Sequence, residues 1–447
     1  MSTPHVVIIG GGFGGLEAAR RLAKAPVRVT LVDRRNHHLF QPLLYQVATA
    51  ALTGPDIAAP LRKVLRRQKN AQVLMAEARS IDLAKKRVEL DEGHLDYDFL
   101  ILAAGATHSY FGHDEWRPFA PGLKTLGEAV EIRRRVLLSY EAAEREPDPR
   151  IRAEHLTFVV IGAGPTGVEL AGALAEIAHH TMAKNFRTFD PGDARVILLE
   201  GGARVLPTFD EKLSSKARRS LHKLGVDVRV NSKVTHIDAT GVVVNDEHIS
   251  ARTVLWGAGV RGALIAETLG VPLDRGGRVP VGPDLSLPGH PEVFVVGDLA
   301  LVKIDDVAVP GLAPAALQGG RHAARAVRET VANQPRTPFR YRDKGSLATI
   351  GRSAAVAQVG RWRFSGYFAW LFWLFIHVLF LIEFRNRLAV VWEWAFQWFT
   401  WQRSARVIME NPPPFTRLPP GQAASGTVPP APVQTGRLPD TLDRAPP

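Results

Sequence analysis

The hydrophobic pattern of the chain contains the same plan twice. An apolar run from Phe158 to Ile161 leads into a glycine-rich turn, a segment with helical spacing, and a second apolar run from Arg195 to Leu199. Continuous apolar runs of this length are typical of parallel strands, which are buried on both faces. The N-terminal residues repeat the plan, with strands predicted from His5 and from Val27 to Val32, and a helix to about Lys24. The pattern therefore predicts two βαβ units.

Glycines occupy the G-x-G-x-x-G spacing in both predicted turns. They are Gly10, Gly12 and Gly15 in the first unit and Gly162, Gly164 and Gly167 in the second. Glycine at these positions permits a tight turn, close approach of backbone N–H groups to a pyrophosphate, and close packing of helix on strand. The phosphate is expected at the helix N-terminus. One such motif could be a purely structural turn, but two copies indicate an α/β fold with two Rossmann-like dinucleotide-binding domains and two dinucleotides.

The second strand of each unit ends in a carboxylate. Asp33 ends the strand of the first unit, and Glu200 ends that of the second. Glu200 is placed to accept hydrogen bonds from both hydroxyls of an adenine ribose and to repel a 2′-phosphate. The sequence therefore favours NADH over NADPH, and Arg204 is the residue that could weaken this preference.

Small residues follow two further buried strands. The predicted strand from Tyr97 to Ala103 runs into Ala104 and Gly105, and a corresponding strand later in the chain ends at Gly259. Small side chains at these positions would let the chain pass close to a flat ring system. The two halves of the chain therefore resemble each other beyond the glycine motif.

Two polar segments leave alternatives open. The strand from Val293 to Leu299 contains Gly297 and Asp298, and this carboxylate either caps the next helix or binds a ribityl hydroxyl of a cofactor. Residues 33–49 are rich in amides and imidazoles, which favours either a functional segment or a capped surface loop.

The C-terminal part of the chain changes in character. Every residue from Tyr367 to Ile382 except His377 is apolar, but this run is shorter than the roughly 20 residues that a spanning helix needs. All tryptophans except Trp116 and Trp256 lie between residues 362 and 401. We therefore predict a C-terminal amphipathic helical membrane-anchoring region that lies in the lipid interface. The alternatives are a buried core hairpin and a dimer interface. Arginines expected to meet anionic lipid are Arg361, Arg363, Arg385, Arg387, Arg403 and Arg406.

Composition narrows the chemistry. The 447 residues suffice for two or three domains, and the absence of cysteine excludes disulfides, thiolate metal sites, iron–sulfur clusters and a dithiol relay. No metal site is predicted, so any redox chemistry requires a bound organic cofactor. The formal net charge of +12 comes without basic runs interleaved with aromatic residues, which favours an anionic membrane surface over nucleic acid as a partner. The strand that begins by His5 leaves no room for a signal peptide before it.

The motifs together resemble those of type II NADH dehydrogenases, the single-subunit NADH:quinone oxidoreductases of respiratory membranes within the two-dinucleotide-domain flavoprotein superfamily. The resemblance extends from His5 to about Ile408. Its motifs are GGGFGG with Asp33, HHLFQPLLYQVAT at 37–49, IGAGPTGVELAG at 161–172, VFVVGDLA at 293–300, PGLAPAALQGGRHAA at 310–324, KGSLATIGR at 344–352 and FRNRLAVVWEW from Phe384.

The resemblance implies a division of the chain. An FAD-binding domain would comprise residues 1–120 and 272–350, and an NADH-binding domain residues 121–271. Membrane-associated helices would occupy residues 351–410. The proline-rich residues 411–447 would form a disordered tail.

The resemblance also assigns roles to residues. The first glycine motif would hold the flavin pyrophosphate, Asp33 the adenosine ribose and Asp298 the ribityl chain. Glu169 would lie near the nicotinamide and the flavin as a catalytic residue, although a glutamate early in a helix also favours the macrodipole. Further expected cofactor contacts are Phe13, Gly14, Arg34, Pro165, Thr166 and Leu317.

Gln318 matches one of two glutamines in the quinone-site segment of the family, and Pro314 replaces the other. Its amide could bind a quinone carbonyl or the flavin pyrimidine edge, or it could fill a polar pocket between domains. The prolines of this segment are expected to delay the helix until Ala315.

The implied activity is oxidation of NADH, hydride transfer to FAD and reduction of a quinone at the cytoplasmic face of the cell inner membrane. Intramembrane acids are lacking apart from Glu383 and Glu393 at segment edges, so no proton pumping is expected. One alternative is a flavin NADH oxidase or ferredoxin-type reductase with a soluble acceptor, which would not need the tryptophan and arginine segment. Another is a non-enzymatic membrane sensor that binds FAD and NADH. A homodimer remains an open alternative.

Overall fold

The first sheet combines strands from both halves of the chain in a computed structural model that describes residues 3–408. Its strand order is β20-β21-β9-β1-β2-β5, in which all neighbours from β21 to β5 are parallel and β20 is antiparallel to β21. The strands are β1 (His5–Ile9), β2 (Arg28–Asp33), β5 (Ala71–Met75), β9 (Phe99–Leu102), β20 (Ser286–Leu287) and β21 (His290–Val295).

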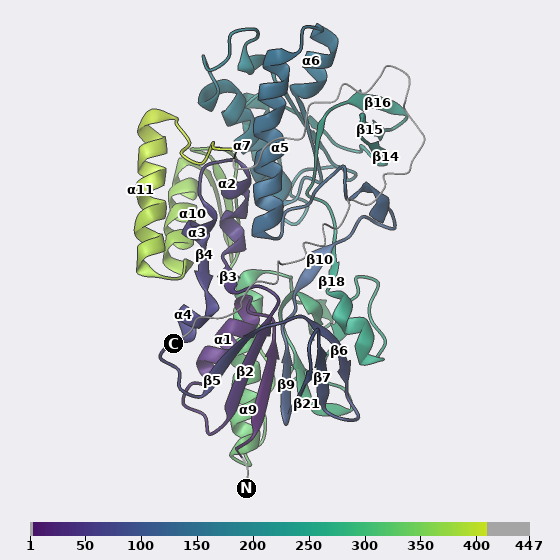
Figure 1. Ribbon diagram of the computed structural model, residues 1–447, viewed down its shortest axis with the longest axis vertical. Helices are drawn as coiled ribbons and strands as arrows, with labels where there is room; N and C mark the ends of the chain where they lie inside the picture. The colour runs from purple at the N-terminus through teal and green to yellow at the C-terminus, as the bar shows by residue number, and fades with distance from the viewer. Residues whose placement is uncertain (1–2, 409–447) are drawn as a thin grey trace, which may run out of the picture. The chain divides into compact units, whose positions relative to one another are not determined.

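Two helices from opposite ends of this region pack closely beside the first sheet (Figure 1). They are α1 (Phe13–Arg21) and α9 (Ala313–Val331). A Cβ added to Gly320 would overlap the backbone of Gly14, so the two helices touch through glycine backbones. An ion pair of 2.6 Å between Glu17 Oε1 and Arg321 Nε joins them beside this contact. The α9 segment therefore belongs to the same core as the N-terminal unit.

The second sheet is wholly parallel, with the order β13-β12-β11-β17. Its strands are β11 (Thr157–Ile161), β12 (Arg195–Leu199), β13 (Val226–Arg229) and β17 (Thr253–Trp256). The helices of this region are α5 (Leu126–Arg145), α6 (Pro149–His155), α7 (Pro165–Glu176) and α8 (Glu211–Lys223). The prediction of two βαβ units in an α/β fold is confirmed.

The chain crosses between the two sheets along a pair of short strands. β10 (Ala106–His108) follows β9 and pairs antiparallel with β18 (Val260–Gly262), which follows β17. The small residues that precede each crossing strand have the expected freedom, because Gly105 and Gly259 adopt φ values of +70° and +68°. Both crossings therefore start at the small-residue strand ends seen in the sequence.

Short strands and helices complete the described fold. The remaining sheets pair β3 with β4, β6 with β7 and β8, β14 with β15 and β16, β19 with β22, and β23 with β24. Their bounds are β3 (His37–Leu39), β4 (Ala58–Pro60), β6 (Ala78–Asp82), β7 (Arg87–Leu90), β8 (His94–Asp96), β14 (Val234–Asp238), β15 (Gly241–Val244), β16 (Glu247–Ser250), β19 (Val279–Pro280), β22 (Ala300–Leu301), β23 (Lys303–Ile304) and β24 (Val307–Ala308). The short helices are α2 (Leu44–Ala48), α3 (Gly54–Ile57) and α4 (Leu61–Leu65).

The segment at residues 37–49 is part of the core and not a surface loop. Leu43 and Val47 are fully buried, and Gln46 is buried as well. Its helix α2 packs against α5 and α7 of the second unit. The surface-loop alternative is therefore wrong, because apolar residues between the polar ones anchor the segment.

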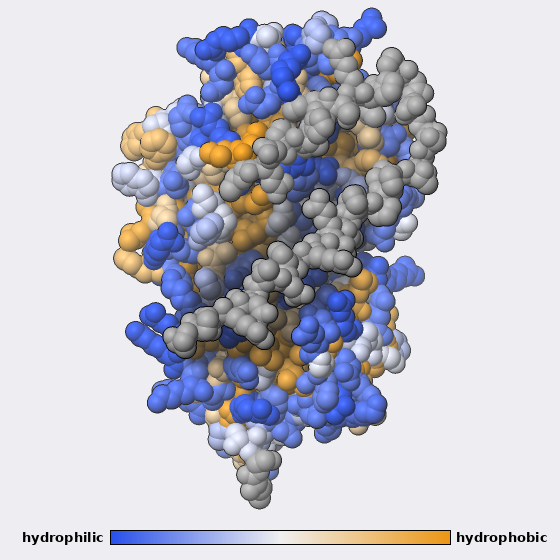
Figure 2. Space-filling view, viewed as in Figure 1, coloured by the Kyte–Doolittle hydropathy of each residue, from blue (hydrophilic) through white to orange (hydrophobic). Residues whose placement is uncertain are grey.

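The C-terminal region consists of an antiparallel sheet followed by two helices that lie side by side (Figure 1). Its elements are β25 (Ser346–Thr349), β26 (Ala355–Val359), β27 (Trp362–Gly366), α10 (Tyr367–Phe380) and α11 (Phe384–Thr400). No helix among residues 3–408 is both long and apolar enough to cross a membrane. Apolar side chains are exposed along α11 at one edge of the molecule (Figure 2).

Two details of the C-terminal half differ from expectation. Helix α9 begins at Ala313, because a proline such as Pro314 is tolerated in the first turn, where its missing N–H is not needed. Arg403 does not face lipid: it is only 8% exposed and pairs with Glu176 at 3.1 Å. The tail prediction for 411–447 falls outside the described residues.

The contact between α1 and α9 gives a prediction about stability. Gly320→Ala should lower the free energy of unfolding by about 1–3 kcal/mol, because the added methyl group must push the two helices apart. Gly127→Ala is the matched control, since Gly127 is exposed on α5 and has room for the methyl group. Thermal unfolding of both variants tests this. Equal melting temperatures for the two would contradict the close contact.

Candidate functional site: two nucleotide turns and a tryptophan-lined pocket

The two glycine turns have the same backbone packing. A Cβ on the third glycine of either motif, Gly15 or Gly167, would overlap the carbonyl oxygen of the first glycine, Gly10 or Gly162. The first glycines have positive φ values of +101° and +94°, which other residues rarely adopt. Both turns therefore require glycine at these positions for the fold itself.

The second glycine of each motif is not required by the packing of the fold. A Cβ on Gly12 or Gly164 would meet nothing within 4 Å, so the fold alone would admit a side chain. Each is the N-cap residue of its helix, α1 or α7, and makes no side-chain capping bond. The space beside these uncapped N–H groups fits the pyrophosphate of a dinucleotide. Phe13 and Gly14 begin α1, and Pro165 and Thr166 begin α7.

The two terminal carboxylates are held in the same way. Asp33 accepts hydrogen bonds from the backbone N–H groups of Gly11 at 2.6 Å and Arg35 at 2.8 Å. Glu200 accepts them from Ala163 at 2.7 Å and Gly202 at 2.8 Å. A carboxylate has about four acceptor positions, so each retains capacity for ribose hydroxyls. The geometry fits one adenine ribose at each strand end.

The arginines near these carboxylates differ in their surroundings. The guanidinium of Arg204 donates to the carbonyl oxygens of Pro207 and Phe209, both at 2.8 Å. Arg34 is exposed beside Asp33. Arg204 is therefore occupied by backbone groups and is poorly placed to attract a 2′-phosphate.

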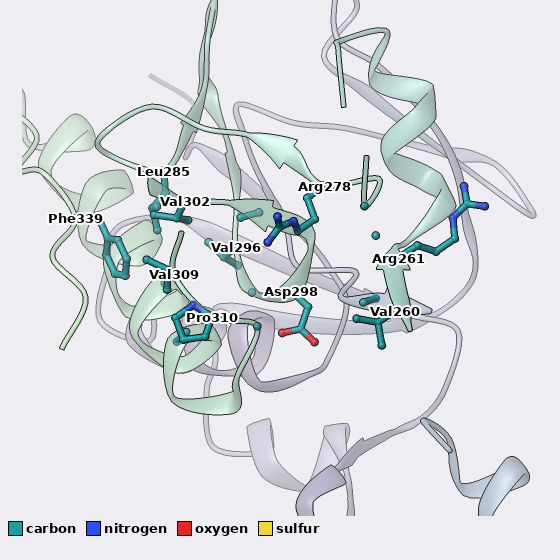
Figure 3. A pocket seen from close by; sticks show the side chains of 18 residues that line it. Val260, Arg261, Arg278, Leu285, Val296, Asp298, Val302, Val309, Pro310 and Phe339 are labelled. Carbon is teal, nitrogen blue, oxygen red and sulfur yellow. The ribbon is translucent and has the colours of Figure 1, made fainter. Parts of the chain in front are cut away.

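A cleft of about 340 Å³ opens near the carboxyl end of β21. Gly297 and Asp298 line it together with Gly262 of β18 and residues at the start of α9, and Figure 3 shows the Asp298 carboxylate beside Pro310. Val296, and not Asp298, is the N-cap of the short 3-10 turn here, so the capping alternative is wrong. A cleft that connects β18, Asp298 and α9 fits the elongated body of a flavin cofactor.

Glu169 lies in a second pocket, which has a volume of about 90 Å³ and tryptophans along its walls. It projects from α7 toward α2, β25 and the C-terminal helices. Burial raises the pKa of Glu169 to about 8, against the hydrogen bond from the backbone of Thr349, which lowers it. The group is therefore predominantly protonated at neutral pH. The tryptophans of the pocket are Trp370, Trp373, Trp394, Trp398 and Trp401.

Hydrogen bonds join the pocket walls across the sequence. Gln46 of α2 donates to the Tyr45 hydroxyl at 2.9 Å and accepts from the indole of Trp394 at 2.7 Å. Burial raises the pKa of Tyr45, and the nearby Glu169 raises it further. The N-terminal segment, α7 and α11 thus share one enclosed polar cluster.

A buried ion pair closes the other side of this pocket. Glu176 at the end of α7 accepts hydrogen bonds from the guanidinium of Arg403 and from the backbone N–H of Arg352. Burial raises the pKa of Glu176, and the two arginines oppose the shift. The residues after α11 are therefore fixed to the second unit by charge as well as by packing.

Gln318 is not brought to the pocket that contains Glu169. Its amide donates to the carbonyl oxygens of Pro314 and Arg342, and its oxygen accepts from the Arg342 N–H at 3.0 Å. These contacts tie α9 to the segment that leads into β25. Its role toward quinone or flavin stays a prediction, as does that of the neighbouring Leu317.

The sequence reasoning missed most of the pocket wall. Tyr45, Gln46, Glu176 and Arg352 line it, and the sequence patterns single out none of them as a site residue. One signal was present, because Glu176 follows Glu169 by two helical turns and shares its face of α7. The approach of α2 and α11 depends on tertiary packing and has no such local signal.

Family comparisons cover nearly all of the described chain. The family model described as "Pyridine nucleotide-disulphide oxidoreductase" matches residues 4–320. The model described as "NDH2 C-terminal domain" matches residues 344–401, which include β25 to α11.

Individual relatives agree with these matches. The chain is 46% identical to the type II NADH:quinone oxidoreductase Ndh of Mycobacterium tuberculosis, over 91% of this chain and 90% of that protein. It is 48% identical to NdhA of the same organism, over 87% of this chain and 86% of that protein.

Solved structures show the same fold. The NDH2 of Plasmodium falciparum in complex with NADH matches with a TM-score of 0.84 at 19% identity, covering 90% of this chain and 99% of that one. The sulfide:quinone oxidoreductase of Aquifex aeolicus matches with a TM-score of 0.67 at 20% identity, covering 86% and 92%.

The environment of Glu200 gives a prediction about nucleotide choice. Glu200→Gln should lower the preference for NADH over NADPH by about tenfold or more, mainly through the KM for NADPH, because the repulsive charge is removed. Arg204→Gln should leave the preference unchanged, because its guanidinium is bound to backbone carbonyls. Steady-state kinetics with both nucleotides test this. A parent enzyme that uses both equally would show that the ribose assignment is wrong.

Proposed function

The chain belongs to the type II NADH:quinone oxidoreductase family, and on this premise we propose that its quinone is reduced in the tryptophan-lined pocket that contains Glu169. The protein is an enzyme that oxidises NADH and reduces a quinone, and it uses FAD and NADH. Bound FAD supplies the hydride-accepting and electron-donating chemistry. Neither the soluble-acceptor reductase nor the non-enzymatic sensor is favoured.

The position of Glu169 among the tryptophans of the pocket is the observation that carries the pocket assignment, and its raised pKa supports it. Reduction of a quinone to a quinol consumes two electrons and two protons. A carboxyl group with a pKa of about 8 holds a proton at neutral pH and can release it to a stronger base. We assign Glu169 as the group that protonates the reduced quinone, with the tryptophan rings providing stacking surfaces for the flat head group.

The two glycine turns are the basis for assigning the cofactor-binding residues. We propose that residues 1–120 and 272–350 hold FAD, with the first glycine turn, Asp33 and Asp298 along its length. Residues 121–271 would hold NADH at the second glycine turn and Glu200. The two crossing strands, β10 and β18, support this division because they are the paired segments between the sheets.

The helices of residues 351–410 are proposed to lie on an anionic lipid surface, on the cytoplasmic face of the cell inner membrane. The exposed apolar side chains of α10 and α11 support this, since Phe368 is 79% exposed and Phe399 is 83% exposed. A long-chain quinone would then enter the pocket directly from lipid.

The raised pKa of Glu169 predicts a pH dependence. Quinone reduction should slow as the pH rises through about 8, because Glu169 then loses the proton it donates. The Glu169→Gln variant should be slower at neutral pH, by about 10²-fold, and should lack this pH dependence. Stopped-flow measurement of enzyme reoxidation by quinone tests both points. An ionisation near 8 that persists in Glu169→Gln would assign it to another group.

The same shift affects stability with a defined sign. The folded state holds the Glu169 proton up to about pH 8, whereas the unfolded chain releases it near the ordinary value of 4.5. The contribution of Glu169 to stability is therefore present below 4.5 and is lost as the pH rises toward 8. Between pH 4.5 and pH 8, the melting temperature of the parent should therefore fall relative to that of Glu169→Gln.

The proposed lipid contact of α10 and α11 predicts that negative charges introduced on these helices weaken membrane binding. Changing both Phe368 and Phe399 to Glu should reduce binding to anionic vesicles by at least tenfold while leaving NADH oxidation with a soluble dye intact, because both side chains are exposed. Met75→Glu is the control, since Met75 is 65% exposed on β5. Vesicle cosedimentation tests this. Unchanged binding by the double variant would exclude these helices as the lipid contact.

A further inference from the structure

Two residues that line the Glu169 pocket each carry a buried hydrogen-bond donor with no partner among the described residues. The donors are Nη1 of Arg352 and the indole nitrogen of Trp373, and both atoms are buried. Trp373 as a whole is only 2% exposed. Buried donors are nearly always satisfied, so two unpaired donors in one pocket point to a ligand that brings acceptors. A quinone carries two carbonyl oxygens and no donors.

Arg352 is held without using this donor. Its guanidinium lies over the rings of Trp398 and Trp401, with centroid distances of 4.4 and 3.8 Å. Its backbone N–H donates to Glu176, which fixes the chain next to Gly351. Cation–π contacts fix the orientation of a guanidinium through its flat face. Its N–H bonds lie in its own plane, so they stay available to an acceptor. The side chain is therefore preorganised before any ligand binds.

The charges around the pocket do not cancel. Its ionisable lining comprises the guanidinium groups of Arg352 and Arg403, the carboxyl groups of Glu169 and Glu176, and the Tyr45 phenol, which stays neutral because burial raises its pKa. Arg403 is paired with Glu176, and Glu169 is predominantly neutral at pH 7 because burial raises its pKa to about 8. Within residues 3–408 the Arg352 guanidinium forms no ion pair with a carboxylate, although its charge acts on Glu176, which Arg403 already pairs. A partly enclosed site of this kind favours a ligand that becomes negatively charged.

We propose that Arg352 binds the quinone oxygen on which negative charge develops and stabilises the quinol anion; this rests on the proposed function of the pocket. NADH supplies the two electrons through the established activity. Addition of a hydride equivalent converts one carbonyl into a hydroxyl and the other into C–O⁻. The O–H bond of Glu169 then breaks, an O–H bond forms on the quinol, and the carboxylate regains its proton from solvent. Arg352 remains a cation throughout and acts on the oxyanion alone.

The test uses the full-length FAD-loaded enzyme with Arg352→Met, which retains length and apolar packing against the two tryptophans. Arg352→Lys retains the charge, and Arg67→Met is the matched control because Arg67 is exposed and lies outside the pocket and the C-terminal region. Two stopped-flow half-reactions are measured: reduction of the enzyme by NADH, and its reoxidation by 2-methyl-1,4-naphthoquinone. A second readout is the Kd of 2-hydroxy-1,4-naphthoquinone, which is an anion at neutral pH.

Arg352→Met should slow reoxidation by about 10²-fold and leave reduction by NADH unchanged. It should also weaken binding of the anionic hydroxynaphthoquinone by at least tenfold, and Arg352→Lys should restore part of both losses. Arg67→Met should change neither. Equal slowing of both half-reactions, or unchanged binding of the anion, would overturn the role of Arg352. Reoxidation by quinone that is unchanged in both Arg352→Met and Glu169→Gln would instead overturn the proposed function of the pocket.

Discussion

The carboxylate of Glu176 holds together segments that are far apart in the chain. It ends helix α7, and it accepts hydrogen bonds from the Arg352 backbone and from the Arg403 guanidinium. Removing one partner of a buried ion pair costs about 3–5 kcal/mol, because the other charge is left without a partner in a poorly solvated place. Glu176, Arg352 and Arg403 all line the tryptophan-lined pocket, so these contacts join its walls. The pocket and the C-terminal helices are therefore energetically linked.

Two carboxyl groups on one face of α7 have different surroundings, because one has a guanidinium partner and the other does not. Glu176 has a guanidinium and a backbone donor, which oppose the effect of burial on its pKa. Glu169 has only the backbone of Thr349 against the same burial, and its pKa rises to about 8. Glu176 thus forms a buried ion pair with Arg403, and Glu169 is the group to which we assign proton donation. Neighbouring charge decides between these roles.

Local patterns predicted what depends on local physics. The sequence could predict the glycine turns, the strands at 195–199 and 28–33 and the carboxylates that end them. Turn geometry and strand periodicity are determined by residues that are close together in the chain. The wall of the Glu169 pocket could not, since it requires α2 and α11 to meet α7. Arg403 was misplaced at the lipid surface for the same reason: a basic residue in a tryptophan-rich segment suggests a headgroup contact until its distant partner Glu176 is known.

A structure of the enzyme with a bound quinone tests the central claim most directly. The account predicts that one quinone oxygen lies within hydrogen-bond distance of the Glu169 carboxyl group, with the head group against the tryptophan rings of α10 and α11. A quinone bound beside Gln318, with no contact to Glu169 and with the tryptophan-lined pocket empty, would contradict it.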